Sequence, residues 1–266
     1  MEGCKPILKW PGGKRSLLPY LLKLVPSSYE RYIEPFLGGG ALFFSLLPKR
    51  ALLSDKNEDL IACYQVIRNR PKALLSLLAG MQNSEEDYYR IRAMIPRTKV
   101  EVAARMIYLT TLSFNGIYRV NHKGQFNVPY GRKRHLKLPL PQAVHAVKEA
   151  LIRCELSHCD FEQSLSRAGR GDFVYLDPPY TLAHDNNGFR KYNAQIFSWD
   201  DQARLAETVH RLHEKGCQIV VSNASHSSIR KMYKGFTQHV VVRSSTIAAS
   251  SIYRRYVEES IFTNVN

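Results

Sequence analysis

The stretch FVYLDPPY, residues 173–180, is the strongest indication of the fold. Its first half, Phe173–Leu176, is apolar and rich in aromatic and branched residues, which favours a buried strand. The strand leads directly into Asp177, Pro178 and Pro179, and the two prolines fix their φ angles and stiffen the turn. In an open α/β sheet, ligands bind beyond the carboxyl ends of the strands. The stretch therefore predicts a rigid polar turn at the ligand-binding edge of such a sheet.

A turn of this kind suits group transfer to an exocyclic amine. The amino group of adenine is a poor nucleophile because its lone pair is delocalised into the ring. The Asp177 carboxylate and the Pro178 carbonyl would accept its two N–H bonds, and Tyr180 would stack on the base. This is catalysis by positioning and electrostatics. An Asp-Pro turn after a strand is also an ordinary structural feature, so further motifs must decide between the two interpretations.

Strands are predicted near both ends of the chain, and helices alternate with them. The predicted strands are Tyr32–Ile33, Ala51–Ser54, Leu151–Leu156, Phe173–Leu176, Gln218–Ser222, Thr237–Val242 and Val257–Phe262. The predicted helices are Ser16–Leu24, Ala41–Leu47, Leu60–Asn69, Lys72–Met81, Ser84–Met94, Val100–Ser113 and Asp200–Lys215, the last capped by Ser198 or Asp200. This alternation favours an α/β fold with a doubly wound sheet, built from both ends of the chain, and a mainly helical insertion after the second strand.

The charge of the chain indicates a polyanionic partner. Among 266 residues, 38 are Lys or Arg and 23 are Asp or Glu, which gives a formal net charge of +15. Residues 56–150 alone hold 16 basic and 7 acidic side chains, and no acidic residue lies between positions 119 and 137. A basic surface so concentrated makes nucleic acid the first candidate.

Other partners are disfavoured by the same sequence. There is no apolar run long enough to span a membrane and no apolar signal-peptide core, so we expect a cytoplasmic protein without a membrane partner. The five cysteines form no CxxC pair, and His158-Cys159 beside Cys154 lacks a fourth ligand at a suitable spacing, so we expect no metal site.

Two motifs near the N-terminus suit a nucleoside cofactor. Glu34–Gly40 (EPFLGGG) follows a short strand and precedes an apolar helix, and glycines there let a ligand approach the backbone closely. Asp55, about 20 residues beyond the start of this motif, suits a ribose diol. The segment Lys9–Lys14 (KWPGGK) is not a phosphate-binding P-loop, because Lys14 is followed by Arg15 instead of Ser or Thr. A tryptophan and a lysine there would suit the amino-acid portion of a sulfonium cofactor.

Taken jointly, KWPGGK, EPFLGGG, SDKN and DPPY resemble the DNA adenine methyltransferase family, in the order typical of the α-group of amino methyltransferases. The segments FNGIYRVN (114–121) and GQFNVPYGR (124–132) resemble that family as well. The resemblance spans nearly the whole chain. It implies a Rossmann-like methyltransferase domain formed by residues 1–55 and 143–266, and an inserted target-recognition domain formed by residues 56–142.

The resemblance also implies the site residues and the ligands. S-adenosyl-L-methionine would be held by Trp10, Lys14, Phe36, Gly38, Gly40, Asp55, Asp160, Phe161 and Asp177. Asp177, Pro178, Pro179 and Tyr180 would receive an adenine flipped out of double-stranded DNA. Contacts to DNA would come from Lys9, Asn115, Arg119, Asn121, Lys123, Asn127, Arg132, Lys133 and Arg134. Among these, Arg119 is the candidate for reading a guanine edge, whereas the lysines and later arginines would contact phosphates.

Some features depart from the family pattern. Thr110-Thr111 stands where relatives often have Asn-Arg, and the serine-rich stretch 243–251 lacks the usual Asn-Gly ending. Both differences concern DNA recognition, so GATC, the common site of the family, is only one candidate sequence. The alternatives are methylation of another amino group (cytosine N4, RNA adenine or protein glutamine) and a DNA-binding protein without turnover. We expect a bacterial or phage-encoded enzyme that acts as a monomer or a weak dimer on DNA.

Overall fold

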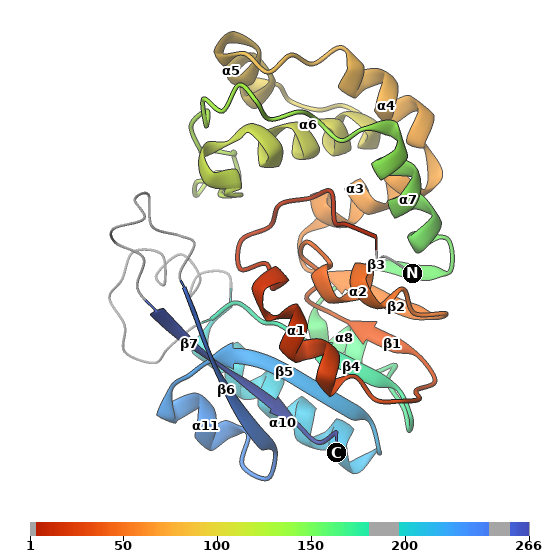
Figure 1. Cartoon of the computed structure of the whole chain (residues 1–266), viewed down its shortest axis with the longest axis vertical. Helices are drawn as coiled ribbons and strands as arrows, with labels where there is room; N and C mark the ends of the chain where they lie inside the picture. Colours follow the sequence, from red (N-terminus) through yellow and green to blue (C-terminus); the bar gives the residue numbers. More distant parts are fainter. Residues whose placement is uncertain (1–3, 181–196, 245–255, 266) are drawn as a thin grey trace. The chain divides into compact units, whose positions relative to one another are not determined.

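The computed structural model describes residues 4–180, 197–244 and 256–265. In these residues the strands form one seven-stranded sheet in the order β3-β2-β1-β4-β5-β7-β6 (Figure 1). The neighbouring pairs β1–β2, β1–β4 and β4–β5 are parallel, whereas β7 is antiparallel to both β5 and β6. The chain winds outward in one direction from β1 and in the other from β4, as expected for a doubly wound sheet.

The strands agree with the predicted ones in number and order. They are β1 (Tyr32–Glu34), β2 (Ala51–Asp55), β3 (Cys154–His158), β4 (Phe173–Leu176), β5 (Gln218–Ala224), β6 (Thr237–Ser244) and β7 (Tyr256–Thr263). The α-helices described are α1 (Leu18–Leu21), α2 (Ala41–Leu46), α3 (Glu58–Asn69), α4 (Pro71–Ala79), α5 (Glu85–Ala93), α6 (Lys99–Leu112), α7 (Pro141–Leu151), α8 (Phe161–Leu165), α10 (Trp199–Glu214) and α11 (Ser227–Met232). Short 3₁₀ turns occupy Arg15–Leu17, Leu22–Leu24 and Phe114–Gly116.

Two predicted elements are wrong in detail. The strand expected at Leu151–Leu156 begins only at Cys154, because the preceding residues belong to α7, which the sequence analysis missed. This helix starts with a proline and buries Val144, Val147 and Leu151, a spacing of three and four residues that is typical of a helix face. The helix expected at Ser16–Leu24 is instead split into a short helix between two 3₁₀ turns.

The chain packs into two compact units. Unit 1 contains Met1–Arg15, Gly38–Leu47 and Asn57–His158, and unit 2 contains Ser16–Leu37, Pro48–Lys56 and Cys159–Asn266. These units follow from packing alone. The functional division into residues 1–55 plus 143–266 and residues 56–142 stays a prediction.

Unit 2 contains the core on one face of the sheet. Alternate residues of the central strands, such as Val174 and Leu176 of β4 and Ile219 and Val221 of β5, are fully buried there. They pack against the apolar sides of α8, α10 and α11. The α10 helix starts at a capping box in which Ser198 and Asp201 bond each other's backbone amides, so the cap predicted at Ser198 is confirmed.

Unit 1 contains a second, mainly helical core. Helices α3, α4, α6 and α7 lie together in Figure 1, and Thr98 closes a capping box with Glu101 at the start of α6. Aromatic residues of α5 and α6 pack against the segment that follows α6, where Tyr88 and Tyr130 have ring centroids 5.2 Å apart. The segment after α6, which carries most of the candidate DNA contacts, is thus anchored on this core.

Candidate active site

The Asp177–Tyr180 turn lies where the sequence predicts it. β4 ends at Leu176, so the turn follows the carboxyl end of a fully buried strand. Val174 and Ile33 are paired in the β1–β4 ladder. Asp177 lies three residues beyond Val174, and Phe36 lies three residues beyond Ile33, so both follow the carboxyl ends of these neighbouring strands. The strand order reverses between β1 and β4, and this switch point is where doubly wound folds bind ligands. The half-buried Asp177 is therefore placed at the edge of the sheet that is suited to chemistry.

Tyr180 is held by a buried acid that the sequence analysis missed. Its hydroxyl donates a hydrogen bond of 2.9 Å to Oε2 of Glu259, a fully buried residue of β7. Burial, together with the nearby charges of Asp177 and Glu259, raises the pKa of Tyr180 well above its ordinary value. The hydroxyl therefore stays protonated and remains a donor over the working pH range, which fixes the ring in one orientation.

A second buried acid lies at the end of β1. The Tyr32 hydroxyl donates a 2.9 Å hydrogen bond to Oε2 of Glu34, and both residues are buried. Burial, followed by the charge of Glu34, raises the pKa of Tyr32 well above its ordinary value. The predicted ribose ligand, Asp55, ends the neighbouring strand β2 and is half-buried. Carboxylates thus stand at the carboxyl ends of β1 and β2 and directly after β4.

The residues expected to frame the adenine of the cofactor form an aromatic cluster. Phe36 stacks on Phe161 with a centroid distance of 5.6 Å, and Phe197 packs edge-on against Phe36 at 5.6 Å. The guanidinium of Arg204 lies 4.5 Å from the centroid of the Phe161 ring, and its nitrogens bind both carboxylate oxygens of Asp160 at 3.2 Å. Phe161 is buried, whereas Phe36 is half-buried, so Phe36 is the ring of the pair more accessible to a ligand.

The remaining predicted cofactor residues belong to unit 1. Gly38 and Gly40 both adopt positive φ, at 48° and 65°, and Gly40 precedes α2. A Cβ on Gly38 would lie 2.8 Å from the Trp10 ring, so the glycine is required by the close approach of that indole. Trp10 also stacks on Tyr118 at 4.6 Å. Lys14 is buried and donates a 2.8 Å hydrogen bond to the carbonyl of Gly12.

The predicted recognition segment forms a hairpin within unit 1. An antiparallel bridge joins Val120 to Phe126, and the backbone of Asn121 bonds that of Gln125 at 2.8 Å. The exposed Arg119 donates from Nε to Oδ1 of Asn127 at 2.8 Å, which orients its guanidinium group. Asn115 lies before the hairpin, is exposed and has a φ of 53°. The segment that resembles the family thus forms a hairpin, whereas its contacts with DNA stay a prediction.

The basic residues predicted to contact DNA are all exposed. One of them, Lys9, comes from a distant part of the sequence. Lys9 packs against Gly116, where an added Cβ would meet its Cδ at 2.6 Å. Its pKa is lowered by partial burial and then by the positive charges of Lys133 and Arg15. Arg132 forms an exposed ion pair of 3.0 Å with Glu85, which contributes little to stability. Lys123, Lys133 and Arg134 are exposed as well.

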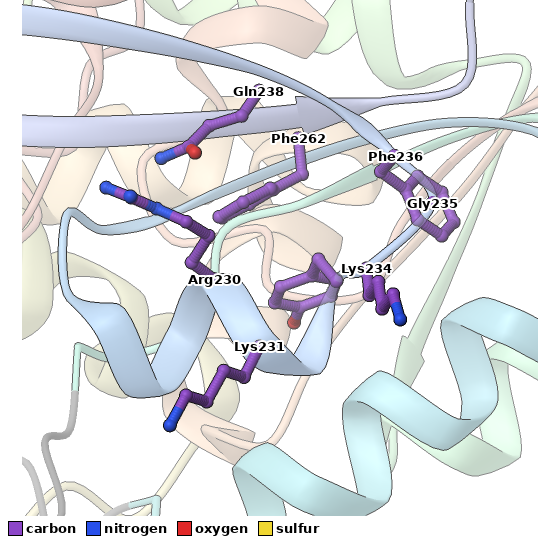
Figure 2. A pocket seen from close by; sticks show the side chains of 8 residues that line it. Arg230, Lys231, Lys234, Gly235, Phe236, Gln238 and Phe262 are labelled. Atoms are coloured by element: carbon purple, nitrogen blue, oxygen red, sulfur yellow. The ribbon is translucent and has the colours of Figure 1, made fainter.

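A separate pocket lies in unit 2 between α11 and the start of β6 (Figure 2). It measures about 450 Å³ and is lined by Arg230, Lys231, Lys234 and Gln238 around an aromatic floor. The floor is part of the core, since Phe262 is buried and stacks on Tyr233 at 4.8 Å. This pocket contains no residue that the sequence analysis selected for the site.

Within the described residues, the structure has neither a cluster of metal ligands nor a helix able to span a membrane. In these residues, no three His, Cys, Asp or Glu side chains gather as metal ligands would. None of the helices described there has the length and apolar composition needed to cross a membrane.

Known proteins resemble this chain over nearly its whole length. The model of the D12 class N6 adenine-specific DNA methyltransferases matches residues 10–247. A type II methyltransferase of Lactococcus lactis subsp. cremoris is 39% identical, covering 98% of this chain and 95% of the relative. The DNA adenine methylase of Escherichia coli strain K12 is 31% identical, covering 97% and 95%. A type II methyltransferase of the archaeon Methanocaldococcus jannaschii is 35% identical, covering 91% and 92%.

A solved structure, a precorrin-8w decarboxylase of Methanobacterium thermoautotrophicum, aligns with 98% of this chain and 99% of its own at 12% identity and a TM-score of 0.41. The fold is established by the strand order of the sheet and not by this similarity. The doubly wound sheet, together with these relatives, places the chain in the class of α/β methyltransferases. Within that class, the chain belongs to the family of D12 class N6 adenine-specific DNA methyltransferases. Membership of this family identifies adenine in DNA as the methylated group. The motifs alone had left other amino groups, and a DNA-binding protein without turnover, as alternatives.

Proposed function

We propose that this enzyme transfers the methyl group of S-adenosyl-L-methionine to an adenine that the Asp177–Tyr180 turn holds outside the DNA duplex. The observation that carries the proposal is the place of this turn. It follows β4 at the switch point of the sheet, and its last residue is fixed by a hydrogen bond to the buried Glu259. A rigid turn at that place can present fixed acceptors to a substrate amine.

The turn contributes positioning and charge. The Asp177 carboxylate and the Pro178 carbonyl accept the two N–H bonds of the adenine amino group and direct its lone pair toward the methyl donor. Positive charge develops on that nitrogen during transfer, and the Asp177 carboxylate stabilises it. One proton must leave the nitrogen afterwards, and the same carboxylate is placed to accept it. Tyr180 holds the base by stacking, which offsets part of the few kcal/mol that unstacking from the duplex costs.

The residues present fit the proposed methyl donor. Bound S-adenosyl-L-methionine supplies an electrophilic methyl group on a sulfonium. Asp55, a half-buried carboxylate at the end of β2, suits the ribose hydroxyls, and the accessible ring of Phe36 suits the adenine of the cofactor. Asp160 and Phe161 would support this side of the site, because Arg204 binds the first and covers the second.

For Trp10, Lys14, Gly38 and Gly40, the proposed role in binding the methionine portion rests on the resemblance of their motifs to the family. Lys14 carries a buried ammonium group, the charge that a cofactor carboxylate requires.

The labelled-methyl assay tests this proposal. Purified protein is incubated with S-adenosyl-L-methionine carrying a labelled methyl group and, in parallel, with unmethylated duplex DNA, RNA or protein. We expect label in N6 of adenine in the duplex DNA alone. Label in RNA or protein and none in DNA would refute the proposed reaction.

The hairpin after α6 is proposed to read the DNA sequence, with Arg119 contacting a guanine edge. The Arg119→Ala variant lacks the guanidinium group that would contact the guanine. It should lose about 1–3 kcal/mol of binding free energy on the cognate site and show a relaxed sequence preference at one base pair. The measurement is methylation of a panel of duplexes that differ by single base pairs.

Lys123→Ala is the matched control for this variant, since Lys123 is an exposed cation on the same hairpin and a proposed phosphate contact. It should weaken binding to every duplex alike and reduce the salt dependence by about one unit of slope. If Arg119→Ala also weakened all duplexes equally, Arg119 would be a phosphate contact and its proposed reading role would be wrong.

A further inference from the structure

The Asp177–Tyr180 turn receives a hydrogen bond from a helix that follows it in the chain. Gln202 of α10 donates from Nε2 to the carbonyl oxygen of Pro179 at 3.1 Å. Pro178 and Pro179 carry no backbone N–H, so they give the turn no donors with which to bond itself. A donor from outside therefore fixes this peptide group in the middle of the turn.

The amide of Gln202 is itself oriented by a second amide. Asn223 of β5 donates from Nδ2 to Oε1 of Gln202 at 3.1 Å, and its own Oδ1 accepts from the backbone N–H of Ala224 at 2.8 Å. Each amide uses its oxygen as an acceptor and its nitrogen as a donor. The hydrogen bonds therefore form a single directed chain that runs from the backbone of β5 to the Pro179 carbonyl.

Both amides occupy positions where the fold otherwise places apolar side chains. Gln202 and Asn223 are fully buried. On α10, Gln202 precedes the buried Leu205, Ala206 and Val209 on the same helical face. On β5, Asn223 continues the face of Ile219 and Val221. Buried amides are costly unless they are bonded, so a pair of them at the end of an apolar face indicates a specific task.

The supports of this chain are rigid. Gln202 lies in the first turn of α10, where its backbone N–H bonds the carbonyl of Ser198 at 3.1 Å and the capping box fixes the helix start. β5 pairs directly with β4, in a register that aligns Val221 with Leu176. Asn223 follows Val221 by two residues and thus lies at the same end of the sheet as the turn, where β5 still pairs with β7. Its position is set by β5, whose ladder with β4 ends at Leu176, directly before Asp177.

We infer that Gln202 is a positioning residue for methyl transfer, which holds the Asp177–Tyr180 turn through the Pro179 carbonyl, and that Asn223 fixes the orientation of its amide. The inference rests on the proposed role of the turn in binding the adenine amino group. If the turn shifts by about 1 Å, the rate of methyl transfer can fall by up to about 100-fold while the substrate still binds. The reason is that the amino group and the methyl donor must stay aligned for the reaction. Gln202 touches no substrate in this scheme and acts only through the turn.

The first test replaces the donor by an apolar side chain of similar length. In the Gln202→Met variant, the single-turnover rate of methyl transfer should fall roughly tenfold, while the affinities for DNA and for S-adenosyl-L-methionine stay within about twofold. Gln218→Met is the matched control, because the Gln218 amide also donates to a backbone carbonyl, that of Ser28, at 3.0 Å. This control should keep the wild-type rate. A wild-type rate in Gln202→Met, or a rate that falls only with the folded fraction, would overturn the inference.

The second test changes the pH, which controls whether the side chain at position 202 can donate a hydrogen bond in the Gln202→Glu variant. In Gln202→Glu, a protonated carboxyl can donate to the Pro179 carbonyl, whereas an ionised one cannot. Burial raises the pKa of such a carboxyl above its ordinary value. The rate of Gln202→Glu relative to wild type should therefore recover as the pH falls from about 8.5 to about 6. A ratio that does not change with pH, in a variant that unfolds like wild type, would contradict the proposed donor role.

Asp177→Ala, measured in the same assay, separates this inference from the proposed function. If Asp177→Ala is inactive and Gln202→Met is fully active, the positioning role of Gln202 is wrong and the role of the turn stands. If Asp177→Ala keeps its turnover, the proposed role of the turn fails, and the inference fails with it.

Discussion

Replacement of Asp177 by alanine should slow methyl transfer by about 100-fold to 1000-fold while leaving DNA binding nearly intact. The carboxylate is the proposed acceptor of the amino group and of the charge that develops on it, and loss of one such preorganised electrostatic contact costs about 100-fold to 1000-fold in rate. Affinity for DNA is dominated by contacts between cations and phosphates, which Asp177 does not make. Single-turnover transfer and equilibrium binding to the same duplex measure the two quantities separately.

Asp200→Ala is the matched control, since Asp200 is an exposed acid in the first turn of α10 and has no proposed role in the site. It should keep the wild-type rate. Asp177→Asn keeps one carbonyl acceptor and should lose less than Asp177→Ala. If Asp177→Ala transferred methyl groups at a rate near that of wild type, Asp177 would not be the residue that holds the amine.

Replacement of Tyr180 by alanine should give the second-largest loss. Stacking of a base on an aromatic ring is worth about 1–3 kcal/mol, so removal of the ring should slow methyl transfer by roughly 10-fold to 100-fold. Tyr180→Phe keeps the ring and loses only the hydrogen bond to Glu259, so it should retain more of the methyl-transfer rate than Tyr180→Ala. Methylation of duplexes by the two variants gives the comparison.

A duplex with a mismatched base at the target adenine refines this test. Unstacking is easier there, so a stacking role predicts that Tyr180→Ala loses less on the mismatched duplex than on the paired one. Tyr20→Ala, which removes an exposed ring in α1, serves as the control and should behave as wild type. Equal losses in Tyr180→Ala and Tyr180→Phe would assign the effect to the hydroxyl instead of the ring.

Much of the fold could be predicted because the central strands have a simple signal. Phe173–Leu176 consists of apolar and aromatic residues, as expected of a strand buried on both faces, and Asp177 and two prolines follow it directly and mark its end. The sequence analysis does not predict helix α7, because the apolar Leu151 and Ile152 favour the start of a strand at this position. Its own signal was present in Val144, Val147 and Leu151. Short elements such as α8 and α11 carry too few residues to show a period.

The site could be predicted where it consists of consecutive residues. Asp177–Tyr180 and the glycine turn are local motifs, so their positions follow from the strands that precede them. Gln202, Asn223 and Glu259 act from α10, β5 and β7, and only the fold shows which groups they reach. A signal did exist, since Gln202 and Asn223 interrupt apolar faces with amides. The serine-rich stretch could not be followed in this way, because residues 245–255 lie outside the described part of the chain.

The most direct measurement is a map of N6-methyladenine in a host that lacks adenine methylation of its own, made by single-molecule sequencing after expression of this chain. The wild-type protein should methylate adenine at one short recurring sequence, and Asp177→Ala should leave the same genome unmethylated. A genome without N6-methyladenine under wild-type expression, or an unchanged pattern under Asp177→Ala, would contradict the account of the turn as the place where adenine is methylated.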